Sequence, residues 1–198
     1  VKVYDQGDVV WKNGRNLNKI VFNESVSGIE GRWFLYGLSK LTEITCSGDH
    51  PNFKFYNGCI YNSDYTELIY YPSGKEYDES VLKSTLTKFG NYSFVQHKLL
   101  KEFVIPNNIV HLGTWVFYNT SATKFIIHEN VETIGDQCFS WSGQLTDVEV
   151  NSPNLTGSSI FAYCNKLKSV TLSEQTTKIP NATFSGCSVL SDINIPVN

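Results

Sequence analysis

The sequence contains no methionine and no long hydrophobic run. No apolar stretch approaches the roughly 18 residues that a membrane-spanning helix needs, and no secretory leader is visible. We therefore expect no membrane span in this fragment. Because the first residue is Val1 and not methionine, we also expect either a mature fragment or a trimmed piece of a longer protein.

Strong charge is missing as well. The 198 residues carry a formal net charge of −3, which provides no basic surface for nucleic acid. The hydrophobic content of 41% is typical of a globular protein and argues against disorder. This length is enough for one sizeable core, so we expect a single domain over residues 1–198 and no nucleic-acid partner.

Catalytic and metal-binding motifs are also missing. None of the four histidines has the spacing of a metal-ligand pair, and there is no nucleophile elbow, phosphate-binding loop or dinucleotide fingerprint. Ser80 and Lys83 match the S-x-x-K spacing, but residues of such common types match it by chance. Five cysteines are an odd number, which excludes a complete disulfide framework. The sequence therefore predicts no metal, no cofactor and no enzyme.

What the sequence does contain is a repeat of 22 or 23 residues. Each copy opens with a pattern of the form L-x-x-I-x-I, and an early copy begins at Leu17. Later copies begin at Leu100, Ala122, Leu145, Leu167 and Leu190. A phenylalanine recurs in the second half of the copies, at Phe117, Phe139, Phe161 and Phe184. Such a fixed register predicts a stack of similar structural units.

The opening pattern alternates apolar and polar residues, which indicates a short strand with one buried face. One strand and its short return segment cannot bury that face alone, whereas stacked copies can. The phenylalanines should then form a single row. We expect a helical or 3-10 turn in each return segment, and a tight bend at Gly113 and Gly135. A β-sandwich is the alternative, but it does not require the same residue types at a fixed register.

These copies resemble the leucine-rich repeats of BspA-like surface proteins of bacteria and protists. The family repeat is similar to L-x-x-I-x-I-P-x-x-V-x-x-I-G-x-x-A-F-x-x-C, and the resemblance covers roughly residues 17–198. One copy matches it at Leu100, Phe103, Ile105, Pro106, Ile109, Leu112, Gly113, Val116 and Phe117. The resemblance implies a leucine-rich repeat solenoid of the α/β repeat class, with strands on the concave face. It also implies a cell-surface or secreted location and a non-enzymatic role in adhesion.

The repeat is interrupted over residues 47–85. Asn57 and Gly58 lie between two runs of β-forming residues, which is a strong signal for a two-residue hairpin turn. We expect strands at 53–56, 59–61 and 67–71, and we interpret the segment as a β-hairpin insertion in an expanded repeat. Six tyrosines gather here, and they either bind a partner or pack the hairpin onto the coils: Tyr56, Tyr61, Tyr65, Tyr70, Tyr71 and Tyr77.

The two ends of the chain differ from the repeats. Residues 1–16 lack the repeat pattern, so we expect them to form an N-terminal cap. The last residues, "INIPVN", read as a new strand without a cap. We therefore expect an open C-terminal end, a truncated array and self-association through the exposed edge.

Two pairs of cysteines could form disulfides. Cys164 and Cys187 occupy the position of the family cysteine and should lie above one another in neighbouring coils, which makes a bond conceivable by distance. Cys46 and Cys59 flank the start of the insertion and could also pair. In both cases the alternative is a pair of free thiols, and Cys138 is expected to be buried.

Five N-x-S/T sequons are candidates for glycosylation, and they have this meaning only in a eukaryotic source. Most of them fall in return segments, where a glycan would face solvent. They are Asn23, Asn91, Asn119, Asn154 and Asn181.

Two columns of side chains on the predicted strands should face outward and form a surface for a ligand. The candidate ligand-binding residues are Glu102, Val104, Lys124, Ile126, Asp147, Glu149, Ser169 and Thr171. Val104 and Ile126 would be the apolar anchor. The alternative is that the alternating charges of Glu102, Lys124 and Asp147 only support strand register.

The sequence leaves three hypotheses about function. The first is a cell-surface binding or adhesion module, whose partner is a host protein, a matrix component or a glycan. The second is a structural spacer or self-associating stalk with no ligand of its own. The third is an enzyme with a dispersed site, which would need a pocket with convergent titrating groups. The first rests on the family resemblance, because fold alone does not fix function.

Overall fold

The computed structural model describes residues 14–26, 28–29 and 35–196. Within them the chain forms strands and two short 3-10 turns, η1 (Gly14–Asn16) and η3 (Glu79–Val81). The strands are β1 (Lys19–Phe22), β2 (Glu43–Cys46), β3 (Phe53–Tyr56), β4 (Cys59–Asn62), β5 (Glu67–Tyr70), β6 (Lys88–Phe89), β7 (Glu102–Val104), β8 (His111–Leu112), β9 (Lys124–Ile127), β10 (Thr133–Ile134), β11 (Asp147–Val150), β12 (Ser169–Leu172) and β13 (Asp192–Asn194).

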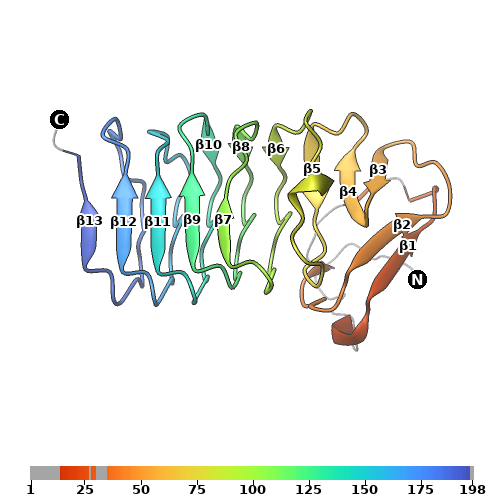
Figure 1. The fold of residues 1–198 in the computed structure, drawn as a ribbon, viewed down its shortest axis with the longest axis horizontal. Helices are drawn as coiled ribbons and strands as arrows, with labels where there is room; N and C mark the ends of the chain where they lie inside the picture. Colours follow the sequence, from red (N-terminus) through yellow and green to blue (C-terminus); the bar gives the residue numbers. More distant parts are fainter. Residues whose placement is uncertain (1–13, 27, 30–34, 197–198) are drawn as a thin grey trace.

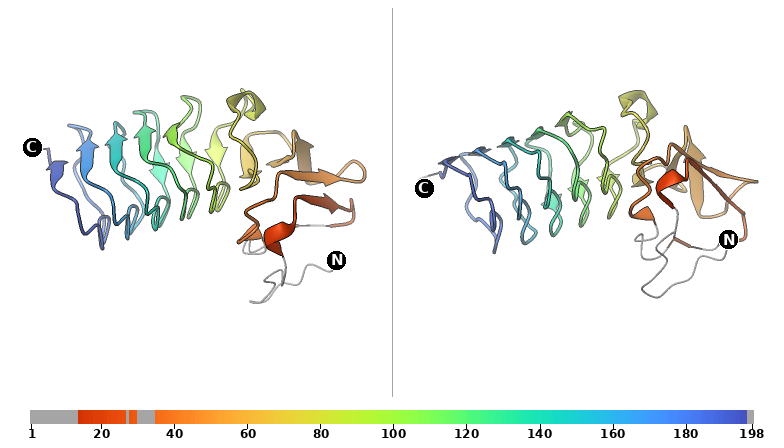
Figure 2. Two further views of the ribbon diagram at one scale, coloured as in Figure 1. Left: turned by 60° about the horizontal axis from the view of Figure 1, so that its bottom comes forward. Right: turned by 90° about the horizontal axis from the view of Figure 1, so that it is seen from below.

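The coils stack along one axis and build two main sheets (Figure 1). The front sheet is five-stranded, with the order β13-β12-β11-β9-β7, and every neighbouring pair is parallel. The rear sheet is six-stranded, with the order β10-β8-β6-β5-β4-β3. Two coils contribute a strand to each sheet, one through β7 and β8 and the other through β9 and β10. The two views of Figure 2 show the same stack of coils. The predicted solenoid is confirmed.

The prediction of helical turns on the return side, and with it the α/β class, was wrong. Alternate backbone amides of the return segments donate to the next coil. An amide between them donates to a carbonyl three residues back, as Tyr118 does to Trp115 O over 3.3 Å. Trp115 donates to Asp136 O over 3.1 Å, and Phe117 donates to Cys138 O over 2.7 Å. Left-handed residues bracket the phenylalanine, as Trp115 and Asn119 do with φ values of 58° and 55°. Because a helix needs these amides for bonds within the segment, bonding between coils excludes it.

The phenylalanine row exists as predicted, and its rings stack almost in parallel. The centroids of Phe117 and Phe139 lie 5.2 Å apart with an interplanar angle of 12°. Tyr71 begins the row, with its ring 5.1 Å from that of Phe94. The full row is Tyr71, Phe94, Phe117, Phe139, Phe161 and Phe184. It forms the centre of the core that runs through the coils.

The repeat glycines are required by the distance between coils and not by a bend. A Cβ on Gly135 would lie 2.5 Å from the carbonyl carbon of Gly113, and one on Gly157 would lie 2.4 Å from that of Gly135. None of these three residues has a positive φ. The glycines therefore let adjacent backbones approach more closely than any side chain would permit.

The hairpin insertion has the predicted strands to within one residue. Asn57 and Gly58 form its two-residue turn, with φ values of 46° and 80°, and Tyr56 pairs with Cys59 across it. One face of the hairpin joins the main core through Tyr61. The other face joins a second core, which covers β1 and β2, through Ile60. The insertion is thus a wall shared by two cores.

All six tyrosines of this segment pack against a core, and three of them, Tyr56, Tyr65 and Tyr77, are only partly buried. Tyr61, Tyr70 and Tyr71 are fully buried. The hydroxyl of Tyr61 donates to Val81 O over 2.8 Å, and that of Tyr71 donates to Glu76 O over 2.7 Å. Burial therefore removes these three side chains from any partner-binding surface.

All five cysteines are free thiols, so neither candidate pair is bonded and the free-thiol alternative holds. The Cys164 thiol donates to Phe139 O over 3.3 Å, and the Cys187 thiol donates to Phe161 O over 3.2 Å. Ser142 makes the equivalent bond over 3.1 Å. Each of these three side chains donates to the carbonyl of a row phenylalanine in the preceding coil. The position therefore needs a small side chain with a donor, which cysteine and serine both supply. Of the predicted N-terminal cap, residues 1–13 lie outside the described residues.

Candidate functional site

The predicted ligand-binding residues all lie on the outward side of the front sheet. In the first column Glu102 pairs with Lys124, Lys124 with Asp147, and Asp147 with Ser169. In the second column the same pairings bring together Val104, Ile126, Glu149 and Thr171. Parallel register thus turns residues that are about 22 positions apart in sequence into direct neighbours. We call these eight residues the strand face.

The strand face has an apolar centre. Val104 has 58% of its surface exposed, although valine usually avoids solvent. Its register partner Ile126 is half-buried. The buried residues between the columns, such as Phe103 and Phe125, point to the core and hold the outward side chains in place. The apolar pair predicted from the sequence is therefore contiguous.

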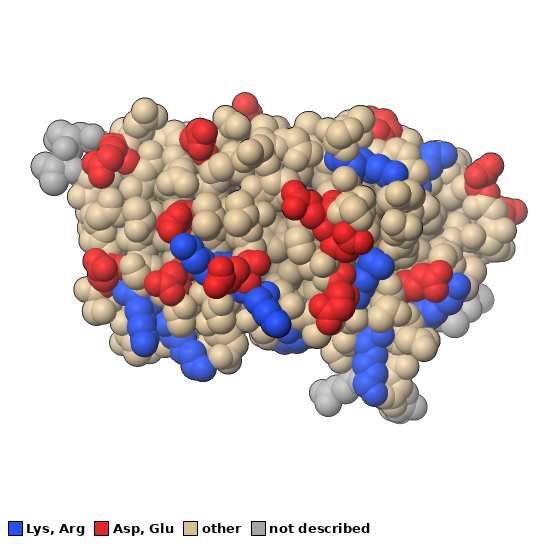
Figure 3. Space-filling model, viewed as in Figure 1, with Lys and Arg blue, Asp and Glu red and all other residues tan. Residues whose placement is uncertain are grey.

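The charges of the strand face are arranged differently from the sequence prediction. Lys124 Nζ lies 2.7 Å from Glu149 Oε1, which belongs to the second column of the next coil. Its direct neighbours Glu102 and Asp147 contribute only longer-range charge. The hydrogen bond to Glu149 is the main reason why the pKa of Lys124 is raised, and the charges of these two neighbours act in the same direction. Three carboxylates around one ammonium leave this face acidic (Figure 3).

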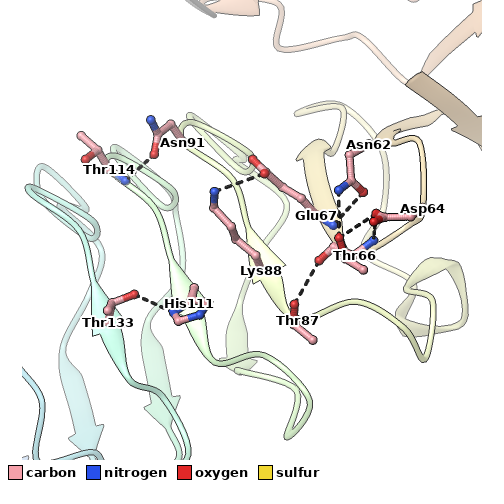
Figure 4. A network of polar contacts seen from close by, with 10 residues as sticks. All are labelled: Asn62, Asp64, Thr66, Glu67, Thr87, Lys88, Asn91, His111, Thr114 and Thr133. Atoms are coloured by element: carbon pink, nitrogen blue, oxygen red, sulfur yellow. Dashed lines mark hydrogen bonds and ion pairs between the residues drawn. The ribbon is translucent and has the colours of Figure 1, made fainter. Parts of the chain in front are cut away.

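The rear sheet carries a polar column that the sequence analysis did not identify (Figure 4). Glu67 and Lys88 form an ion pair of 3.2 Å, and His111 Nδ1 lies 3.0 Å from Thr133 Oγ1. Register pairs these four residues in order, β5 to β6 to β8 to β10. The sequence signal for this column is the alternation of polar and apolar residues within each rear strand. Strands β6, β8 and β10 have only two residues each, and two residues are too few to establish an alternating pattern. Each polar group bonds across neighbouring strands, so the column supports register.

A cavity of about 460 Å³ lies where β2 meets β3, and its lining includes Cys46, Asp49, His50 and Lys54. The His50 ring is occupied by backbone bonds: Nε2 faces Val26 O, and Nδ1 accepts from two amides at 3.1 Å. Both ring nitrogens therefore serve the turn, which leaves neither for proton transfer. Among residues 14–26, 28–29 and 35–196, no group of three or more histidine, cysteine or acidic residues could hold a metal ion.

The S-x-x-K pair is not assembled as a catalytic site. Lys83 Nζ lies 3.1 Å from the ring centroid of Tyr56 and 5.4 Å from that of Tyr65. The Ser80 amide donates to Asp78 Oδ1 and caps the η3 turn. The lysine is thus engaged in a cation–π contact between two tyrosines.

The candidate glycosylation residues lie mainly in solvent. Asn23, Asn91, Asn154 and Asn181 are exposed, whereas Asn119 is half-buried and accepts a bond of 2.7 Å from Lys98 Nζ. In the part of the chain that the structure describes, no helix is long and apolar enough to cross a membrane.

The comparisons with known proteins agree with the repeat. The family model described as "BspA type leucine rich repeat region" matches residues 3–82 and 69–191, in six copies. No curated protein matches the chain.

Solved structures show the same fold at low sequence identity. The pneumococcal vaccine antigen PcpA superposes with a TM-score of 0.77 at 24% identity, over 90% of this chain and 44% of that chain. A leucine-rich cell surface protein from Faecalibacterium prausnitzii gives 0.74 at 22% identity, over 89% and 47%. A leucine-rich repeat protein from Eubacterium ventriosum gives 0.69 at 24% identity, over 90% and 49%. The chain therefore spans less than half the length of each of these proteins.

Proposed function

Because the chain belongs to the BspA-type leucine-rich repeat family, we propose that it is a non-enzymatic binding module, displayed on the cell surface or secreted. The module recognises a protein, a matrix component or a glycan on another cell through the strand face. Repeat arrays suit this role because each coil adds a few side chains to one continuous surface.

The proposal is carried by the apolar centre of the strand face. Val104 and Ile126 are register neighbours, and Val104 is more than half exposed. An exposed aliphatic pair inside a rim of charged residues has the composition of a protein interface, where a few apolar anchors supply most of the binding free energy. Stability of the fold does not require it, since the side chains that hold this sheet to the core point the other way.

The charge of the strand face specifies the chemistry of the partner. Lys124 is already paired with Glu149, so among the described residues Glu102 and Asp147 have no ion pair of their own beside the apolar pair. A partner that presents a basic and apolar segment complements this surface. Such complementarity acts mainly on the association rate, so binding should weaken as salt is added.

The experiment is a binding screen with the immobilised domain against matrix proteins and glycans, using a Val104→Asp/Ile126→Asp double variant. We expect the double variant to lose at least about tenfold in affinity, because two aspartates remove the anchor and add charge. Val21→Asp is the matched control, since Val21 has the same exposed fraction of 58% on β1. Thermal melts must show that all variants are folded.

The spacer alternative gives a different result in the same screen. A stalk without a ligand would show no binding by either form and concentration-dependent oligomers in light scattering. That combination would overturn the binding proposal.

A further inference from the structure

One edge of the solenoid contains no acidic residue. In five successive coils, the segment that begins at the phenylalanine of the row and ends before the next strand lacks aspartate and glutamate. These segments are 94–101, 117–123, 139–146, 161–168 and 184–191, and they contain four lysines. Figure 3 shows lysines along the lower edge of the molecule, beneath the carboxylates of the front sheet. Positive and negative side chains are therefore separated between this edge and the strand face.

Two large aromatic side chains project from the middle of this edge. Trp141 is 48% exposed and Tyr163 is 46% exposed. Their rings lie 4.7 Å apart at an angle of 30°, one coil after the other. Neither residue belongs to a hydrophobic core. Their apolar surface faces solvent as a continuous stack.

The backbone does not require aromatic residues at these positions. Trp141 and Tyr163 both have left-handed backbones, with φ values of 59° and 60°. Glycine and asparagine adopt this conformation most readily, and the equivalent positions of the neighbouring coils are indeed Asn119 and Gly186. Trp115 adopts the same conformation, so the backbone accepts a bulky aromatic residue at such positions without requiring one.

Two lysines bond to amide side chains on this edge, in the coil before Trp141 and in the coil of Trp141 itself. Lys98 extends forward by one coil, and its Nζ lies 2.7 Å from Asn119 Oδ1. Lys166 extends backward by one coil, and its Nζ lies 2.8 Å from Gln144 Oε1. These bonds use the amide oxygens, so the two amide NH₂ groups remain as further donors. The edge thus offers hydrogen-bond donors and aromatic surface without a carboxylate.

We propose that this edge, formed by Lys98, Asn119, Trp141, Gln144, Tyr163 and Lys166, binds an acidic polysaccharide. Sugar rings present an apolar C–H face, which packs on the exposed aromatic rings. Carboxylate or sulfate groups of the chain accept charge-assisted hydrogen bonds from the two lysines. The amides of Asn119 and Gln144 bond to hydroxyl groups. The edge lies beside the strand face but uses different residues, so this inference does not rest on the proposed function.

A polysaccharide fits this arrangement because the donors and rings extend over three adjacent coils. The ammonium groups of Lys98 and Lys166 bond in the coils of Asn119 and Gln144, and the Tyr163 ring belongs to the next coil. Because parallel coils lie about 4.8 Å apart, this row of groups spans roughly 10 Å. That span exceeds one sugar ring and requires linked sugars. A small anion could contact one lysine but not the aromatic stack as well.

The test measures binding of the intact chain to heparin, hyaluronan, dextran sulfate and unmodified dextran by calorimetry. Heparin and hyaluronan distinguish sulfated from purely carboxylated chains, and the two dextrans differ only in charge. The variants are Trp141→Ala/Tyr163→Ala and Lys98→Gln/Lys166→Gln. Lys178→Gln is the matched control, because Lys178 is an exposed lysine outside this edge.

We expect at least one acidic chain to bind and unmodified dextran not to bind. Each double variant should weaken binding by about tenfold or more, and the control should leave it unchanged. The lysine variant should also lower the dependence of affinity on salt. Failure of every acidic chain to bind would overturn the proposal. Loss in the lysine variant alone would also overturn it, because that result means attraction of any polyanion.

Both double variants are also tested against the partner of the strand face. Retention of that binding separates the two surfaces, so that failure of one proposal leaves the other to be judged on its own data.

Discussion

The hydroxyl of Thr156 pairs with both backbone groups of Ile134. Its oxygen accepts from the Ile134 amide over 2.8 Å and donates to the Ile134 carbonyl over 2.8 Å. Ile134 ends β10, the edge strand of the rear sheet, so a single side chain occupies the place of the next strand. In the front sheet the Asn194 side chain likewise bonds to both backbone groups of Leu172. Its oxygen accepts from the Leu172 amide over 2.7 Å, and its nitrogen donates to the Leu172 carbonyl over 3.2 Å. Side chains thus satisfy backbone groups where strand pairing stops.

Thr156→Val should destabilise the protein by about 1–3 kcal/mol, because the isosteric side chain leaves both backbone groups of Ile134 without a partner. Urea denaturation of protein produced in bacteria measures this, since the substitution also removes the sequon at Asn154. Thr177→Val is the matched control on an exposed threonine. Equal denaturation midpoints for both variants would contradict this role for the hydroxyl.

The strands and the phenylalanine row could be predicted because stacking repeats every constraint. A position that contacts its own copy in the next coil tolerates few residue types, so Phe117 and Phe139 reveal the register directly. The eight residues of the strand face followed from the same register and from alternation within each strand. The pairing of Lys124 with Glu149 did not follow, since it depends on side-chain rotamers and not on position.

The return side could not be predicted for a physical reason. Alternate backbone amides bond from coil to coil, and the left-handed positions hold Trp115, Trp141 and Tyr163, which give no local signal for that conformation. Short segments without such a signal are easily read as helical turns. The recurrence of Gly113 and Gly135 is visible in the sequence because each coil repeats the same constraint. The reason for glycine at these positions is the short distance between coils, which only the structure shows.

Gly135→Ala should destabilise the protein by about 1–3 kcal/mol or prevent folding, because the new methyl group overlaps the backbone of the preceding coil. The contact atoms are backbone atoms of Gly113 and Thr114 at 2.5 Å, and they cannot rotate away. Gly143→Ala is the matched control, since no atom lies within 4 Å of its added Cβ. Thermal melts that rank Gly143→Ala below Gly135→Ala would refute the close approach of the coils.

Phe139→Ala should cost about 3–5 kcal/mol of unfolding free energy, because it leaves a cavity between two stacked rings. Phe139 is fully buried, with neighbours at 5.2 and 5.1 Å on its two sides. Phe184 is only partly buried and has one ring neighbour, at 5.7 Å. Phe184→Ala should therefore cost clearly less in the same chemical denaturation experiment. Equal losses would mean that the row does not act as a stacked core.

The stability of the protein should fall between pH 6.5 and pH 4 because of His97. This side chain is fully buried, and neither ring nitrogen has a hydrogen-bond partner among the described residues. Burial lowers the pKa of His97 from 6.5 to about 4. Between these two pH values His97 therefore binds a proton in the unfolded chain but not in the folded chain. The free energy of unfolding should fall by up to about 3 kcal/mol across this range.

His97→Leu isolates this effect, because leucine is apolar and does not titrate. The variant should lose the stability change between pH 6.5 and pH 4 that the parent shows in urea denaturation at several pH values. The titration of Asp64 and Asp78 does not interfere with this comparison of pH profiles. Hydrogen bonds lower their pKa below 3.8, so the stability they contribute is present above that pH and is lost only at lower pH. Identical pH profiles for parent and variant would show that His97 takes up its proton without cost in the folded protein.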